Sequence, residues 1–215
     1  LNLIWDSYNV EAQHALDFGV SNRFTYGFNY RHNAASSNFL TEFTRENRFG
    51  IYIQDEWRIT NALTAVGGVR YDLDTFINPT ISPRFSLIYK PHPDHSFRAE
   101  VAQAYRPPTI FETQTISQSV TTIPGVPFPL NANLQGSHNL TPEKITSFDI
   151  GYQGWYLKHR LRIRADLFLN HISDLIGQFQ ITPAAPPFLP PGFFTFQNRG
   201  QADIYGGEAG LEFLA

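Results

Sequence analysis

Alternation of apolar and polar side chains is the feature that most constrains how this chain can fold. In residues 23–32, RFTYGFNYRH, the aromatic residues fall on one face and charged or small residues fall on the other. Residues 63–74 and 161–170 repeat the same period of two, which is the period of a β-strand with two different faces. These runs reach about ten residues, longer than the usual strand of a globular sheet and suited to a tilted strand that crosses a membrane. We therefore expect an all-β, antiparallel sheet.

The connections between the expected strands alternate in length, and this favours a membrane barrel over a soluble sandwich. Barrels of the outer-membrane type carry short turns at one end and long loops at the other. We expect short turns at 20–22, 60–61, 91–94 and 157–159, and longer connections at about 33–41, 75–80, 106–142 and 181–192.

Composition excludes several classes of function. The formal net charge is −3, which gives no basic face for nucleic acid. The chain has no cysteine, so a disulfide framework, a zinc–thiolate site and a cysteine nucleophile are excluded. Charged residues make up only 16 %, against about 25 % in ordinary soluble domains. The mean hydropathy of −0.26 does not argue against a membrane barrel, because only alternate residues of its strands face lipid.

Aromatic residues recur beside every expected short turn, on the face that carries the apolar residues. Rings of this kind are typical of the belt at a membrane–water interface. Asp55 shares this face, so we expect either that it lies near the lipid headgroups or that a bulge shifts its register. The expected belt contains Phe18, Phe24, Trp57, Tyr89, Phe97 and Tyr156.

Three segments resemble motifs of TonB-dependent outer-membrane receptors. AYRPPTIFE (104–112) resembles the arginine-proline end of one of their strands, where the prolines stop the hydrogen-bond ladder. NLTPEKITSFDIGYQ (139–153) is similar to the family's N-L-x-P-E stretch, with Asp149 where glutamate is common. NRGQADIYGGEAGLEF (198–213) looks like its N-x-G-x-A-x-x-x-G-x-E strand. The three occur in the order that the family shows.

The resemblance implies a partial receptor barrel over residues 1–215: an antiparallel transmembrane β-barrel fragment, about nine strands of a larger barrel. It implies short periplasmic turns and long extracellular loops, in the outer membrane of a Gram-negative-type bacterium. The family's barrel has 22 strands and a plugged lumen. The plug domain and the closing C-terminal strands would then lie outside this chain, and we expect that the fragment does not fold alone, because its two edges are unpaired.

The function implied by the resemblance is active uptake of a scarce nutrient, with a ferric siderophore first and cobalamin, haem or oligosaccharide as other ligands. The expected partners are outer-membrane lipid, TonB acting through the absent plug, and the small ligand; no cofactor is expected. Tyr105, Arg106, Glu112 and His138 are the candidate substrate contacts on the external loop. The expected lumen-facing residues are Arg70, Asp72, Asp74, Arg98, Glu100, Arg162, Arg164 and Asp166.

Other classes of function have weaker support in the sequence. The chain contains no phosphate-binding glycine loop, no G-x-S-x-G elbow and no H-E-x-x-H motif. HPDH (92–95) lacks a third metal ligand nearby, so we expect neither a metal site nor an enzyme. A passive porin-like channel and a soluble all-β binding module remain as alternatives. A plug domain upstream would separate the receptor from the porin, and solubility without detergent would favour the binding module.

Overall fold

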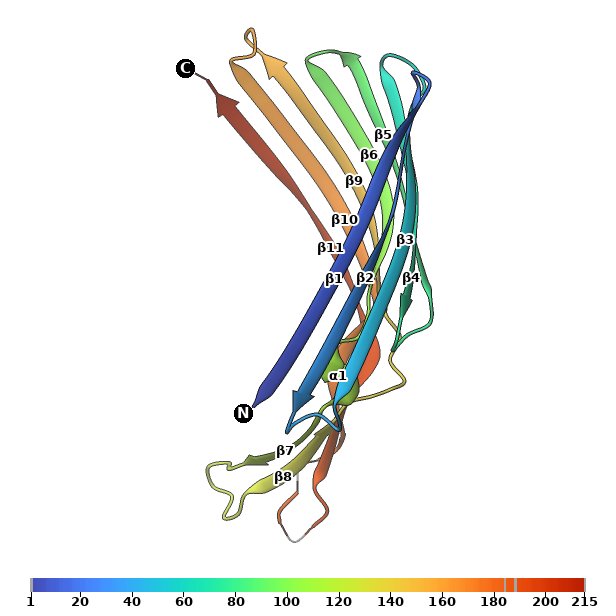
Figure 1. Ribbon diagram of the computed structural model, residues 1–215. Coiled ribbons are helices and arrows are strands. Elements are labelled where there is room, and N and C mark those ends of the chain that lie inside the picture. Colours follow the sequence, from blue (N-terminus) through green and yellow to red (C-terminus); the bar gives the residue numbers. More distant parts are fainter. Residues whose placement is uncertain (1, 184, 188, 215) are drawn as a thin grey trace.

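The computed structural model describes residues 2–183, 185–187 and 189–214, and within them eleven strands form one curved sheet (Figure 1). A single helical turn, α1 (Ile110–Gln114), lies at one end of this sheet. The strands are β1 (Leu3–Phe18), β2 (Asn22–Ser37), β3 (Thr44–Arg58), β4 (Leu63–Asp74), β5 (Thr80–His92), β6 (His95–Arg106), β7 (Ile116–Thr121), β8 (Leu130–Gln135), β9 (Glu143–Tyr156), β10 (Leu161–Thr182) and β11 (Gly192–Phe213).

Nine of these strands are long and antiparallel to their neighbours, which confirms the expected fold class. They follow one another in chain order, except that β6 pairs directly with β9. The short strands β7 and β8 belong to the segment between β6 and β9, where the sequence indicated only a loop. They form a hairpin, and β8 joins the far end of β11 in a parallel pairing of four residues.

The two ends of the sheet differ as the connection lengths predicted. All four expected short turns lie at one end, and the long connections lie at the other (Figure 1). β2 continues to Ser37, five residues into the connection expected at 33–41, whereas β10 ends at Thr182 and β11 begins at Gly192, within two residues of the bounds expected for the fourth connection. Ladder hydrogen bonds satisfy the backbone in water as well as in lipid, so pairing continues past any apolar band. Residues 184 and 188 of the fourth long connection lie outside the described residues.

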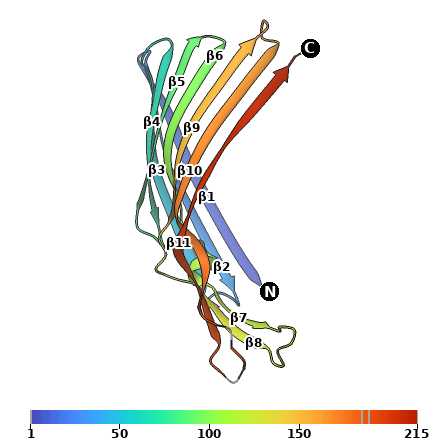
Figure 2. The ribbon, with the colours of Figure 1, turned by 180° about the vertical axis from the view of Figure 1, so that it is seen from behind.

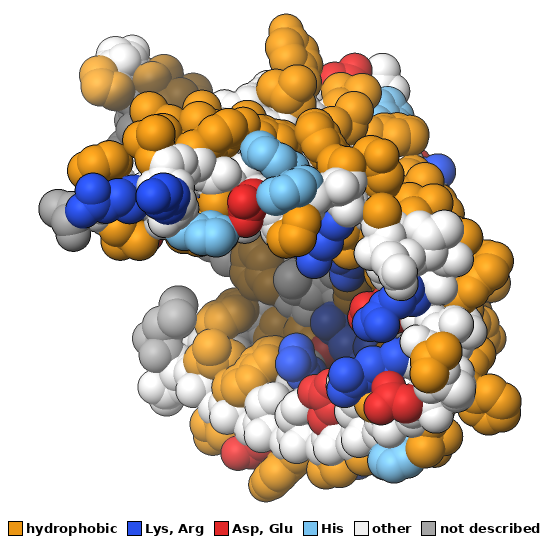
Figure 3. Space-filling view, turned by 90° about the horizontal axis from the view of Figure 1, so that it is seen from above, with side chains coloured by type: hydrophobic (Ala, Val, Ile, Leu, Met, Phe, Trp, Pro, Cys, Tyr) orange, Lys and Arg blue, Asp and Glu red, His pale blue; other side chains and the backbone are white. Residues whose placement is uncertain are grey.

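Register separates the side chains into an apolar face and a polar face. Residues directly opposite each other in a ladder share a face, so Leu87, Ala99, Ile150 and Leu167 form one apolar row across four strands. Viewed along the strands, the sheet curves around a hollow in which basic and acidic side chains gather, and much of the outer surface is hydrophobic (Figure 3). Because this single sheet packs on no second layer, large hydrophobic residues on every long strand remain exposed.

The aromatic residues expected in a belt share the apolar face near the short turns. Phe18 and Phe24 meet edge to face, with ring centroids 6.2 Å apart. Asp55 lies on this face in an unbroken register, so the bulge considered from the sequence is wrong. It is three residues from the turn end of β3 and accepts a 2.7 Å hydrogen bond from Asn22.

The sheet is open, with β1 at one edge and β11 near the other (Figure 2). Along most of β11 the side away from β10 has no partner strand among the described residues. An open sheet with this curvature has the form of part of a barrel. In the described parts of the chain, no helix has the length and apolar character needed to span a membrane.

Candidate functional site

The polar face carries a network of ion pairs centred on β3 and β4. Arg70 pairs with Asp72 at 2.5 Å and donates a second hydrogen bond of 2.6 Å to Asn29 on β2. Arg48 lies directly opposite Asp74, one row closer to the loops than Asp72, and its Nε atom is 2.8 Å from Asp74. The network therefore joins three neighbouring strands of the same face, through Asn29 on β2, Arg48 on β3 and the charged residues of β4.

Further ion pairs continue this network toward β10 and β11. Apart from Arg164, the predicted lumen-facing residues all belong to the network. All eight of those residues lie on the polar face, as the cross-strand register shows. Arg164 has no ion-pair partner among the described residues. The remaining pairs are Arg84–Glu100 at 3.0 Å, Arg98–Asp166 at 3.5 Å and Arg162–Glu212 at 3.6 Å.

A pocket of about 250 Å³ opens on the polar face near the loop end, and we call it the polar pocket. Arginine and aspartate side chains make up much of its wall. Arg31 is the arginine of this wall that has no ion-pair partner within the described part of the chain. The lining residues are Asn29, Arg31, Arg48, Arg70, Asp72, Leu73, Asp74, Ile77, Thr80, Ser82, Tyr105 and Pro107.

The segment 107–115, which we call the strap, crosses from β6 to the loop ends of β2 and β3. Thr109 and Glu112 form a capping box that starts α1 directly after the double proline. Arg106 anchors the base of the strap: it donates to both Glu112 oxygens at 3.1 Å and to both Glu143 oxygens at 2.6 Å. One guanidinium thus joins β6, the strap and β9.

Hydrogen bonding in this anchor shifts the pKa values of Arg106 and Glu143, which lie at the loop ends of β6 and β9. Hydrogen bonds from Arg106 lower the pKa of the Glu143 carboxyl below its usual value, against the opposing effect of partial burial. The Glu143 and Glu112 carboxylates in turn raise the pKa of Arg106. The Arg106 guanidinium and the Glu143 carboxylate are therefore both held in their charged forms at neutral pH.

The far end of the strap is fixed by backbone pairing and a small apolar cluster. Thr115 is fully buried and forms an isolated β-bridge with Leu40. Ala35, Leu40 and Ile110 pack together as buried residues, with Phe39 and Phe76 against them. The strap is consequently attached at both ends.

The four predicted substrate contacts occupy different places in this arrangement. Tyr105 lines the polar pocket, because β5 and β6 part beyond the pair Arg84–Ala102. Arg106 and Glu112 bond to each other in the anchor. His138 lies beside Gln114 of α1, with Nδ1 3.3 Å from the amide nitrogen. The structure therefore brings Arg106 and Glu112 together and leaves Tyr105 and His138 apart from them.

Several polar residues of the site were missed from the sequence. Glu46 is 2 % exposed, and it accepts hydrogen bonds of 2.6 Å from both Asn33 and Arg48. The segment ENR (46–48) lies next to an expected loop, and its charged alternation gave no apolar face to recognise. Arg31 was assigned to the polar face without a role.

The described residues contain no group of three or more His, Asp or Glu side chains placed to hold a metal ion. His92 and His95, the pair considered for metal, have ring centroids 6.0 Å apart in the tight turn between β5 and β6. Chemically, the site offers charged hydrogen-bond donors and acceptors around a pocket, which suits recognition of a polar ligand.

Comparison with known proteins assigns the architecture. The β-barrel model of TonB-dependent receptor-like proteins matches residues 2–214. The siderophore receptor PirA of Pseudomonas aeruginosa matches with a TM-score of 0.81 and 14 % identity, over 96 % of this chain and 39 % of that one. No curated protein shows a significant match.

Two further solved structures share the fold at similar distance. A variant of the ferric enterobactin receptor PfeA of Pseudomonas aeruginosa, in complex with enterobactin, has a TM-score of 0.78 and 16 % identity, over 96 % of this chain and 33 % of that one. The hemophore receptor HasR of Serratia marcescens has a TM-score of 0.80 and 15 % identity, over 99 % and 40 %. The present chain thus spans about two fifths or less of each of these three structures. It belongs to the TonB-dependent receptor family and comprises part of the β-barrel.

Proposed function

We propose that this chain is part of an outer-membrane receptor that imports a ferric siderophore with energy delivered through TonB. Membership of the family supports nutrient uptake across the outer membrane of a Gram-negative bacterium. The structural neighbours include receptors described as binding siderophores, and one described in complex with a hemophore and haem. In this proposal the plug domain that contacts TonB and the remaining barrel strands belong to parts of the protein outside this chain.

The observation that carries the proposal is the polar pocket beneath the strap, on the face that lines the hollow of the sheet. Paired charges make this wall hydrophilic without giving it a strong net field. The unpaired Arg31 supplies a cation toward the loop end, where a ligand from outside would arrive. An anionic chelate matches such a site, because arginine forms strong charge-assisted hydrogen bonds with anionic oxygens.

The predicted substrate contacts enter this proposal with different roles. Tyr105 borders the pocket, and its hydroxyl, which accepts a hydrogen bond from Gln103, would meet ligand only at the edge of the pocket. Arg106 and Glu112 hold the strap above the pocket, and they would meet ligand only by exchanging their present bonds. His138 borders the strap through Gln114 and would contact ligand at its outer side.

The test measures uptake of radiolabelled iron bound to a catecholate siderophore by iron-starved cells that express the full-length receptor. Uptake should disappear when TonB is deleted. Arg31→Ala should lower the apparent affinity about tenfold, the effect of losing one charge-assisted hydrogen bond. Arg160→Ala, in the turn at the opposite end, serves as the matched control. Uptake that continues without TonB would overturn the proposal in favour of a passive channel.

A further inference from the structure

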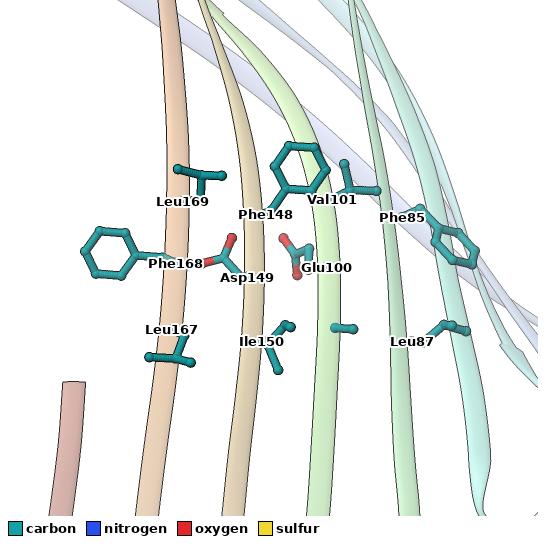
Figure 4. Close-up of a pocket in the computed structure, with 11 residues that line it drawn as sticks. Phe85, Leu87, Glu100, Val101, Phe148, Asp149, Ile150, Leu167, Phe168 and Leu169 are labelled. Atoms are coloured by element: carbon teal, nitrogen blue, oxygen red, sulfur yellow. The ribbon is translucent and has the colours of Figure 1, made fainter. Parts of the chain in front are cut away.

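A groove of about 520 Å³ lies on the apolar face of β5, β6, β9 and β10 (Figure 4). Two apolar rows form its walls: Phe85, Val101, Phe148 and Leu169 in one, and Leu87, Ala99, Ile150 and Leu167 in the other. Its volume is within the range of small-molecule sites.

The groove exists because a small side chain interrupts a row of large ones. Ala99 lies directly between Leu87 on β5 and Ile150 on β9. The larger side chains on either side stand out from the sheet and leave a depression above the alanine methyl group. All four strands have partners on both sides, so the depression is not a product of the open edges.

Polar and aromatic groups mark the two ends of the same strands. Toward the loops, Lys144 of β9 shares the apolar face, and its ammonium group forms no ion pair or hydrogen bond with the described residues. Nearby, His171 Nδ1 and Asp203 Oδ1 lie 2.7 Å apart, so the Asp203 carboxylate is paired with His171 and not with Lys144. Toward the short turns, Tyr152 and Tyr156 of β9 belong to an aromatic cluster with Phe97.

Distances along β9 match the thickness of a bilayer. Six residues separate Ile150 from Lys144, and six separate it from Tyr156. Six residues span about 20 Å of strand, or about 15 Å of depth at a tilt near 40°. The groove therefore sits near the middle of a hydrocarbon layer of about 30 Å, with Lys144 at one boundary and Tyr156 at the other.

We propose that the groove holds an acyl chain of an anionic phospholipid whose headgroup binds Lys144. The hydrophobic effect does not favour the groove over other lipid contacts, because the surroundings are equally apolar. Specificity comes instead from van der Waals contact on the groove walls and from attraction between the Lys144 ammonium and the net negative charge of the headgroup. The proposal rests on the outer-membrane placement given above, and it is independent of the imported nutrient.

The experiment uses the full-length receptor in nanodiscs that contain phosphatidylglycerol and phosphatidylcholine, with retained lipid counted by native mass spectrometry. We expect one retained phosphatidylglycerol. Ala99→Leu fills the groove and should lower its retention about fivefold or more. Val101→Phe fills it from the adjacent row and should act in the same way, which covers a folding defect in either variant.

Two matched controls make the result specific. Ala165→Leu adds the same volume on the same face outside the groove and should change nothing. Lys144→Gln should lower retention of phosphatidylglycerol about fivefold and leave that of phosphatidylcholine unchanged, whereas Lys158→Gln at the short-turn end should have no effect. Equal retention by wild type and both groove-filling variants would overturn the proposal that the groove holds the lipid. A receptor that fails to insert would overturn the membrane placement as well.

Discussion

Arg106, the last residue of β6, donates two hydrogen bonds of 2.6 Å to Glu143, the first residue of β9. The same guanidinium reaches Glu112 in the first turn of α1. A single residue thus closes the strand pair and fixes the direction in which the long connection leaves it. Because Pro107 and Pro108 follow at once, the chain cannot continue the ladder and enters the strap.

Replacing Arg106 with alanine should loosen the strap and leave the sheet intact. The pair is partly exposed, so we expect a loss of no more than about 1 kcal/mol in local stability, or about fivefold faster amide exchange in residues 107–115. Hydrogen exchange on the full-length receptor measures this. Arg23→Ala at the opposite end provides the control, since its Asp17 partner is 3.9 Å away and exposed. Unchanged exchange in the strap would show that the apolar cluster alone holds it.

The strap anchor should also respond to acid. The pKa of Glu143 is lowered in the folded state by its hydrogen bonds to Arg106. A group of this kind contributes stability above its unfolded pKa, and that contribution is lost as the pH falls through the folded value. Amide exchange in the strap, corrected for its intrinsic pH dependence, should therefore stay slow from neutral pH to about pH 5 and rise in stronger acid. Glu143→Gln should remove this pH dependence. If amide exchange in the variant still rises in acid, another carboxyl is responsible.

The fold could be predicted because alternation acts locally and repeats. Residues 23–32 and 63–74 each show their two faces without any knowledge of neighbouring strands. β1 was harder to recognise, because His14 interrupts the apolar face and Ala15 the polar face. The end of β2 was placed too early for a physical reason: beyond the apolar band both faces meet water, so the alternation that marks a strand fades while its hydrogen bonds continue.

The position of the strap could not be predicted from the sequence, because its contacts join distant parts of the chain. Leu40 and Thr115 are 75 residues apart, and no local pattern records their pairing. The capping box Thr109–Glu112 was a visible signal for α1 that the sequence interpretation did not use. Tyr105 reaches the polar pocket only because β5 and β6 separate near the loops, which depends on register rather than on residue type.

Glu46 should be important for the stability of the loop end. Its carboxylate is buried against Arg48 and Asn33, so Glu46→Ala leaves these donors without their acceptor. We expect a loss of about 2–4 kcal/mol in unfolding free energy, measured by urea unfolding of the full-length receptor in detergent. Glu42→Ala removes an exposed carboxylate from the same region as a control. Equal stability of the two variants would contradict a structural role for the buried cluster.

Gly136 should tolerate no side chain, because the strap backbone lies against it. A Cβ atom there would lie 2.5 Å from the backbone of Thr113, while the Gly136 amide donates a 2.8 Å hydrogen bond to Thr115. Backbone cannot yield as a flexible side chain does, so Gly136→Ala should push the β7–β8 hairpin away from α1. We expect limited proteolysis of the full-length receptor to cut between residues 116 and 135 at least about fivefold faster, since cleavage follows the population of the opened form. Gly67→Ala, where a Cβ atom meets nothing within 4 Å, should leave the cleavage rate unchanged. Equal rates in the two variants would show that the hairpin is held by β11 rather than by the strap.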